Sequence, residues 1–260
     1  LTKINPLELS YWKTKGKGVE LPYAGTYYFA FDMRQGKWNS ENRSHIAKQI
    51  DKFSIVKSVD SAGGVAENWM SPIFSSGAPS SLLERSDGRS FRSVSLPSQM
   101  KLVFDSNSRN QIVAEIVQRD IKKNLNIDVE LVSRDWKSYL HALMSGAFEG
   151  QKPVLYRMGW LCPLLNVYGC FLMFHSKNKN NYSGWVPPNG DGLLSELSNI
   201  IDDKKNLKRQ KEIVATLEGL IATERVFVPV YFYTQQFFLS QNAARFTANA
   251  LGQIFLDYSY

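Results

Sequence analysis

The sequence predicts an α/β fold built on a sheet that contains parallel strands. The main observation is the order of elements between residues 100 and 160, which alternate as strand, helix, strand, helix and strand. This alternation favours parallel pairs joined by right-handed crossovers. The composition agrees with a folded globular chain, since 43% of the 260 residues are hydrophobic and 21% are charged. No run of 18 or more apolar residues occurs, so no transmembrane helix is expected.

The first hundred residues predict few regular elements. Residues 1–25 contain several Gly and Pro residues and are expected to be loop-like, whereas the aromatic-rich segment Thr26–Met33 predicts a strand. Apolar residues at helical spacing predict one helix over residues 41–59. Residues 59–98 are rich in Ser, Gly and Pro, and long irregular segments of this kind often line sites or wrap the surface.

The pattern becomes regular from residue 100 onward. The strands are expected at Met100–Asp105, 127–133 and 153–160. Between the first two strands, residues 108–125 place Ile and Val on one helical face, with Ser108 as the predicted N-cap. A second helix is predicted to be capped by Asp135 and to end near Gly146.

The C-terminal third predicts two helices and a strand. The helices are expected at residues 193–203 and 206–224, and the strand at residues 226–240. Pro229 lies inside this strand and cannot donate a backbone hydrogen bond. The strand is therefore expected either at the edge of a sheet or with a bulge.

The charge of the chain does not point to nucleic acid. The formal net charge is +7, but the basic residues are scattered, and their densest cluster, residues 202–212, mixes both signs at helical spacing. A solvated helix face explains such a cluster. Because no nucleic-acid-binding motif accompanies it, we expect no nucleic-acid partner.

Signals for catalysis or cofactor binding are weak. The 3 histidines are not at metal-binding spacing, and no nucleophile-elbow, zinc-protease or phosphate-loop motif occurs. We therefore expect no enzymatic activity and no cofactor. Cys162 and Cys170 match no zinc-site spacing. They could form a disulfide in an oxidising compartment, but two half-buried thiols explain them equally well.

Aromatic side chains gather where the predicted strands and helices begin or end, as Trp136, Trp160 and Tyr233 do. Aromatic residues with a few polar groups suit a groove that holds an adaptable ligand. The alternative is that these residues belong to the core.

Several segments, taken in order, carry a resemblance to a known family. They are TYYFAFDMRQGKW, the helix–strand–helix segment 108–149, YRMGW, NNYSGW and RVFVPVYFYTQQFFLS. Together they resemble the C-terminal half of the bacterial extracellular solute-binding proteins of family 5, the oligopeptide- and dipeptide-binding proteins that serve ABC importers. No single motif is specific, but their order along the chain is.

The resemblance implies a fold and a domain organisation. Members fold as two lobes that close on the ligand about a hinge. The expected fold is a periplasmic-binding-protein-like (class II) C-terminal lobe with a mixed sheet flanked by helices. Residues 26–234 would form this lobe. Residues 1–25 and 235–260 would be flanking segments that cross to an N-terminal lobe, which this chain lacks.

The resemblance also implies a function. The chain would be the C-terminal part of the substrate-binding component of an ABC importer, periplasmic or tethered to the cell surface as a lipoprotein. Its partners would be an oligopeptide or related small solute, the N-terminal lobe and a membrane permease. The alternative is a ligand-sensing domain of a transcriptional regulator. A helix-turn-helix upstream of Leu1 would favour the regulator, whereas a signal peptide with a lipobox cysteine would favour the receptor.

The resemblance places the ligand-binding residues at the end of the third predicted strand and nearby. They are Trp136, Tyr156, Arg157, Trp160, Leu161, Cys162, Pro163 and Tyr233. Arg157 would supply a hydrogen-bond donor, and Trp136 and Trp160 would supply aromatic walls.

The chain departs from the family pattern at one of these positions. Peptide-binding members carry an aspartate three residues after the equivalent of Trp160, which pairs with the α-ammonium of the ligand. Pro163 stands there, and residues 161–167 contain no acid. We therefore expect a ligand whose corresponding end is neutral, acylated or more apolar, with Arg157 available for a carboxylate or carbonyl. The alternative is that the loop has shifted register and an acid from the other lobe pairs with the ligand instead.

Overall fold

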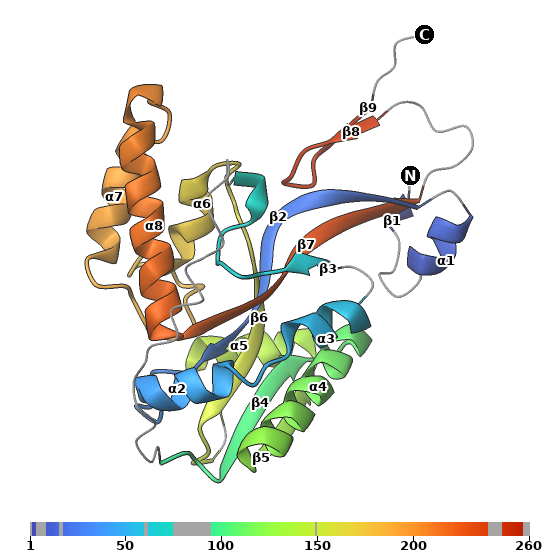
Figure 1. Cartoon of the computed structure of the whole chain (residues 1–260), viewed down its shortest axis with the longest axis vertical. Helices are drawn as coiled ribbons and strands as arrows, with labels where there is room; N and C mark the ends of the chain where they lie inside the picture. The colour runs from blue at the N-terminus through green and yellow to red at the C-terminus, as the bar shows by residue number, and fades with distance from the viewer. Residues whose placement is uncertain are drawn as a thin grey trace.

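The computed structural model describes residues 2–3, 9–15, 18–59, 62–74, 95–148, 150–238 and 246–256. A seven-stranded sheet in the order β1-β7-β2-β6-β4-β5, with β3 paired to β7, forms its centre (Figure 1). Its strands are β1 (Thr2–Lys3), β2 (Gly18–Phe31), β3 (Ala62–Val65), β4 (Gln99–Asp105), β5 (Asp128–Arg134), β6 (Val154–Leu161) and β7 (Phe227–Phe238). A separate two-stranded sheet pairs β8 (Phe246–Ala248) with β9 (Ile254–Leu256).

Helices connect and cover these strands. They are α1 (Leu9–Thr14), α2 (Ser40–Ala47), α3 (Lys52–Ser58), α4 (Ser108–Leu125), α5 (Trp136–Ser145), α6 (Val167–Phe171), α7 (Gly190–Ile200) and α8 (Leu207–Glu224). Short 3-10 turns lie at Pro72–Phe74, Leu172–Phe174 and Lys204–Asn206. No helix within the described ranges is both long and apolar enough to cross a membrane.

The predicted α/β class and the mixed sheet are confirmed. Strand β4 pairs in parallel with both β5 and β6, as the alternating order requires. Strand β2 runs antiparallel to β6 and to β7, which makes the sheet mixed. The five elements predicted between residues 100 and 160 are all present.

The predicted helix ends are largely correct. Asp135 caps α5 by accepting hydrogen bonds from the backbone N–H groups of Lys137 and Ser138, and Gly146 ends this helix in the left-handed conformation. The predicted cap of α4 is off by one residue. Asn107 has the extended backbone that an N-cap needs and accepts from the backbone N–H of Asn110, whereas Ser108 is already helical.

Two predictions in the first sixty residues were wrong. Residues 41–59 form two helices because Asp51 begins α3 anew, its side chain accepting from the backbone N–H of Ser54. Residues 1–25 are not simply a loop, since α1 forms and β2 begins at Gly18. Strand β2 starts early because its first residues pair with the last residues of β7, far away in the sequence.

Strand β7 lies inside the sheet, so the edge position considered for it was wrong and the bulge was right. The register between β2 and β7 shifts where Tyr27 opposite Tyr231 gives way to Tyr28 opposite Pro229. The outer halves of β2 and β7 run beyond the other long strands and pair with each other from Gly18–Pro22 to Thr234–Phe238 (Figure 1). Whether the flanking segments cross to another lobe stays a prediction.

Two hydrophobic cores cover the two faces of the sheet. One packs α2, α3 and α4 against it, with Ile55, Leu102 and Val117 fully buried. The other packs α5 to α8 against the opposite face, with Leu143 and Leu217 fully buried. Burying one such side chain contributes roughly 1.5–3 kcal/mol. The two cores therefore hold the strand ends, and the side chains on them, in fixed positions.

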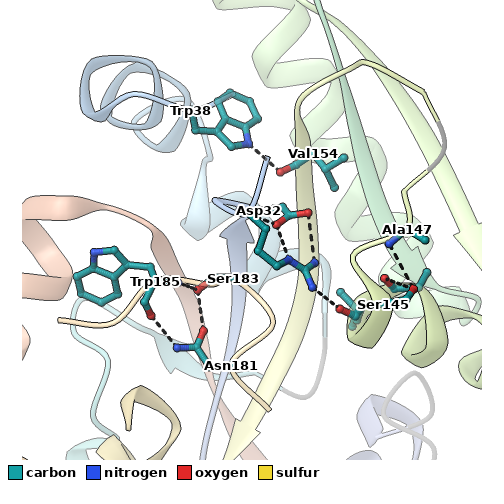
Figure 2. Close-up of polar contacts among 11 residues, drawn as sticks. Asp32, Trp38, Ser145, Ala147, Val154, Asn181, Ser183 and Trp185 are labelled. Atoms are coloured by element: carbon teal, nitrogen blue, oxygen red, sulfur yellow. Dashed lines mark hydrogen bonds and ion pairs between the residues drawn. The ribbon is translucent and has the colours of Figure 1, made fainter. Parts of the chain in front are cut away.

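Polar contacts fix the end of β2 to the elements beside it, as Figure 2 shows. The buried Asp32 carboxylate pairs with Arg34 at 2.8 Å, and Arg34 Nη1 donates to the carbonyl oxygen of Leu143 in α5 at 2.7 Å. Trp38 Nε1 donates to the carbonyl oxygen of Val154 at 2.9 Å. The last of these bonds anchors the amino-terminal end of β6, the strand that carries Arg157, Trp160 and Leu161 towards its other end.

Candidate functional site

The candidate site lies where the parallel strands end. The carboxyl ends of β4, β5 and β6 meet at one edge of the sheet because the three strands run in the same direction. Asp105 is the last residue of β4, Trp136 begins α5 directly after β5, and Arg157–Leu161 closes β6. Open α/β sheets bind ligands in the crevice outside such strand ends. The structure thus brings together predicted residues from two separate segments.

Arg157 is held in place by neighbouring side chains. Its Nη1 lies 2.7 Å from Asp105 Oδ1, and its Nη2 donates to the Tyr233 hydroxyl at 3.0 Å. The guanidinium also lies 4.5 Å from the centre of the Tyr27 ring, within range of a cation–π interaction. The expectation that Arg157 is available for a ligand carboxylate therefore needs correction, because its guanidinium already forms an ion pair with the Asp105 carboxylate.

Burial governs the protonation of this group of residues. Burial alone would lower the pKa of Arg157, but its interactions with Tyr233, Tyr27 and Asp105 outweigh this and raise the pKa well above its ordinary value. Burial raises the pKa of Tyr27, and the positive charge of Arg157 offsets only part of that rise. Arg157 stays charged and Tyr27 stays a neutral phenol, whose hydroxyl donates to Asn110 Oδ1 at 3.2 Å.

Gly159 lets Tyr233 reach Arg157. A Cβ atom added at Gly159 would collide with the Tyr233 hydroxyl. The Tyr233 ring also stands 5.6 Å from the Tyr231 ring at an interplanar angle of 81°, and Tyr231 stacks on Tyr27 at 4.5 Å. The Gly-Trp pair of β6 therefore has a packing role, since the glycine makes room for a tyrosine from β7.

The loop after β6 is tied into a compact turn. Cys162 and Cys170 form a disulfide, with their Cα atoms 4.6 Å apart, which settles the pairing that the sequence left open. Gly169 contributes two further contacts, because its N–H donates to Asn166 Oδ1 at 2.9 Å and its carbonyl accepts from Trp160 Nε1 at 3.2 Å. The turn is thus fixed to the end of β6 by the disulfide and by the hydrogen bond from the Trp160 ring.

The outer surface of this turn is apolar. Leu161, Leu164 and Leu165 are 44%, 43% and 49% exposed, and Pro163 is exposed beside them. Trp136 is 52% exposed at the start of α5. Large apolar side chains exposed together, rather than singly, mark a surface that contacts another molecule or another part of the protein.

Other predicted site residues do not face this surface. Tyr156 is fully buried in the core shared with α5 to α8, because alternate residues of a strand point to opposite faces. Cys162 is buried, and its sulfur belongs to the disulfide. Tyr233 and Trp160 are partly buried and contact the site through Arg157 and the disulfide turn.

Sequence reasoning missed Asp105, Asn110 and Tyr27. Asp105 ends a predicted strand, but its place beside Arg157 depends on the strand order β6-β4-β5, which the sequence pattern leaves open. Asn110 lies one helical turn further on and donates its Nδ2 to Asp105 Oδ1 at 2.8 Å. Tyr27 gives no such signal, since its place opposite Gly159 depends on strand register.

No family model matches the chain, but several known proteins are similar to it in sequence or in fold. The oligopeptide-binding protein OppA of Bacillus subtilis is 25% identical over 257 residues, which span 92% of this chain and 46% of that protein. The periplasmic oligopeptide-binding protein OppA of Salmonella typhimurium is 25% identical over 228 residues, 82% of this chain and 40% of that protein. The chain thus spans less than half the length of these curated relatives.

A solved structure of the Escherichia coli murein tripeptide-binding protein MppA has the same fold. It superposes with a TM-score of 0.72 at 20% identity and covers 91% of this chain and 48% of that one. Haemophilus influenzae OppA, solved in complex with the peptide RPPGFSPFR, superposes with a TM-score of 0.71 at 18% identity. By sequence and by fold, the chain is similar to a part of the peptide-binding proteins OppA and MppA, as the resemblance to the extracellular solute-binding proteins of family 5 predicts.

Proposed function

We propose that the protein to which this chain belongs binds an oligopeptide or a related small solute and delivers it to an ABC permease. The observation that carries the proposal is the sequence relationship to peptide-binding proteins over most of the chain. Those relatives are binding proteins rather than enzymes, in keeping with a chain that binds without performing chemistry. No observation favours the alternative of a regulator domain or a nucleic-acid partner.

The surface at the carboxyl edge supports this function. Trp136 and Leu161 expose apolar area on two neighbouring elements, and Trp160 stiffens the turn between Cys162 and Cys170. Ligand sites bury most of the surface of their ligand, and a single open face cannot do so. We therefore propose that a second lobe closes over this edge and that Trp136, Trp160, Leu161 and Pro163 contact the ligand directly.

Arg157 and Tyr233 have a supporting role in this proposal. The ion pair with Asp105 leaves Arg157 no excess charge to offer, but it fixes the guanidinium beside the end of β6. A ligand carbonyl can accept a hydrogen bond from such a preset donor without requiring the group to reorganise. The role of Tyr156 is indirect, since its side chain lies in the core below the strand.

The apolar turn defines which end of a ligand fits. A buried ammonium without a carboxylate partner costs several kcal/mol in lost hydration. Pro163 has no charge and no backbone N–H, and the exposed neighbours of Pro163 in the turn are leucines. We propose that the ligand places a neutral or acylated end, or an apolar side chain, against this turn.

The disulfide supports a location outside the cytoplasm. Disulfides persist in the periplasm and at the cell surface and are rare in reducing compartments. Cys162 and Cys170 form one within a surface turn. We propose that the protein works in the periplasm or tethered to the cell surface, where an importer receives its solute.

The proposed function is tested by calorimetric titration of the longer natural protein with a series of tri- to pentapeptides. We expect saturable binding that Trp136→Ala weakens by at least about tenfold. Phe53→Ala is the matched control, because Phe53 is 73% exposed and belongs to α3, a helix that covers the opposite face of the sheet from α5. Absence of binding to any peptide of the series, or equal losses in both variants, would contradict the proposal.

A further inference from the structure

A second concave feature lies away from the candidate site. A cavity of about 260 Å³ opens between the α2–α3 connection, the C-terminal half of α8 and the first residues of β7. The start of β7 pairs with the end of β2, and the end of β2 pairs with the start of β6. The cavity therefore lies towards the amino-terminal end of β6, whereas the candidate site lies at its carboxyl end.

Lys52 supplies a positive charge at the cavity wall, and among the described residues its ammonium group has one hydrogen-bond acceptor. Its Nζ donates to the carbonyl oxygen of Ala66 at 2.9 Å, and an ammonium group has three donors. Burial lowers the pKa of Lys52 to about 8, Glu67 counteracts part of this effect, and Arg225 adds to it. The attraction to Glu67 is thus too small to offset the cost of burying the charged ammonium group of Lys52.

The second acid of the cavity is already engaged. Both oxygens of Glu218 accept backbone hydrogen bonds, Oε2 from Trp69 at 2.9 Å and Oε1 from Met70 at 2.7 Å. Burial raises the pKa of Glu218 to about 7, so the carboxyl is only partly ionised near neutral pH. Lys48, Lys52 and Arg225 also line the cavity, so its cationic side chains outnumber the acids Glu67 and Glu218.

Apart from Asn68, the rest of the lining is apolar and partly aromatic. Trp69, Phe227 and Pro229 line the cavity beside the charged groups. The volume is below the range of pockets that hold drug-sized molecules, so a fitting ligand is small. An apolar body with one negative group matches such a lining better than a fully hydrated inorganic ion.

We propose that this cavity binds a small carboxylate with an apolar body, whose carboxylate accepts hydrogen bonds from Lys52. The body of the ligand lies against Phe227 and Pro229. This site is separate from the peptide site proposed above and does not depend on it, because none of the residues that line the cavity belongs to that site.

The charges make binding depend on pH in a defined direction. The ligand carboxylate favours the charged form of Lys52 and the neutral form of Glu218, and Lys48, Glu67 and Arg225 are the other charged groups of the cavity. Raising the pH removes the proton from Glu218 around pH 7 and from Lys52 around pH 8. Both changes disfavour an anion, so affinity falls between about pH 7 and pH 9.

The experiment titrates the 260-residue chain with benzoate and with its uncharged analogue benzamide in a calorimeter. We expect saturable benzoate binding at about pH 7 that is at least about tenfold tighter than benzamide binding and weaker at about pH 9. Lys52→Met should abolish this preference. Lys57→Met is the matched control, because Lys57 lies exposed on the same helix and does not line the cavity.

The proposal is overturned if benzoate and benzamide bind alike, if benzoate does not bind, or if Lys52→Met leaves the preference intact. Should Lys52→Met fail to fold, the unmodified chain still tests the proposal, through the ratio of its affinities for benzoate and benzamide and through the pH dependence of that ratio. A preference for benzoate that is independent of pH would also contradict the assigned role of Lys52.

Discussion

Asp105 and Arg157 form an ion pair across two neighbouring parallel strands, with 2.7 Å between Oδ1 and Nη1 and side chains that are 13% and 12% exposed. A buried pair of this kind contributes little over an apolar pair, but removing one partner leaves an uncompensated charge. The pair thus binds the end of β4 to the end of β6 and sets the geometry of the carboxyl edge.

Asp105→Asn should therefore lower the free energy of unfolding by about 3 kcal/mol. The substitution keeps the shape of the side chain and removes the charge that balances Arg157. Asp128→Asn is the matched control, because the Asp128 pair with Lys122 is 62% and 49% exposed, and such surface pairs contribute under about 1 kcal/mol. Urea unfolding of both variants measures the difference. Equal losses would show that the Asp105 pair has no special role.

Reduction of the disulfide should destabilise the chain by about 2–3 kcal/mol, the entropy of closing a loop of this length. Thermal unfolding with and without dithiothreitol measures the loss. The double variant Cys162→Ser, Cys170→Ser provides the control, since its midpoint should not respond to the reductant. Two reactive thiols in the unreduced chain under denaturing conditions would show that the pair does not form.

Gly159→Ala should be destabilising by about 1–3 kcal/mol, because the added methyl group meets the Tyr233 hydroxyl. Adding Tyr233→Phe removes that hydroxyl and should recover part of the loss. The matched control is Gly219→Ala in α8, where a Cβ atom meets nothing within 4 Å. It should stabilise the helix by about 0.5–1 kcal/mol. If Gly159→Ala and Gly219→Ala change the free energy of unfolding alike, the close approach of Tyr233 to Gly159 is contradicted.

Glu218 should make stability fall with rising pH. Burial raises its pKa in the folded chain to about 7 from the ordinary 4.5. The contribution of Glu218 to stability is complete below the lower value and is lost as the pH rises through the upper one, by up to about 3 kcal/mol. Unfolding of the parent and of Glu218→Gln between about pH 4 and 8 compares the two slopes. Parallel curves would contradict the raised pKa.

The fold could be predicted well where local pattern and tertiary structure agree. The five elements between residues 100 and 160 carry clear periodicity, and the capping role of Asp135 follows from its own side chain. The early start of β2 could not be predicted, because Gly18–Pro22 gains its strand partner from residues more than two hundred positions away. The apolar spacing over residues 41–59 predicts one continuous helix. Asp51 instead ends that pattern, because its side chain caps the backbone N–H of Ser54 and starts a new helix.

The positions of the candidate site residues could be predicted only in outline. Trp136 and Leu161 are exposed at the expected edge, because helix starts and strand ends are readable from the sequence. Tyr156 is buried in the core, since the sequence does not reveal which face of a strand looks towards the site when both faces are covered. The pairing of Arg157 with Asp105 depends on the order β6-β4-β5, which the sequence pattern leaves open.

The central claim, that the turn after β6 receives an uncharged end of a peptide, is tested most directly by one calorimetric comparison on the longer natural protein. Peptides with a free N-terminus and their N-acetylated counterparts are titrated into the parent and into Pro163→Asp. We predict that the parent binds acetylated peptides at least as tightly as free ones and that Pro163→Asp shifts the preference towards free peptides. Free peptides that bind at least tenfold tighter to the parent, about 1.4 kcal/mol, with a preference unchanged in Pro163→Asp, would contradict the claim.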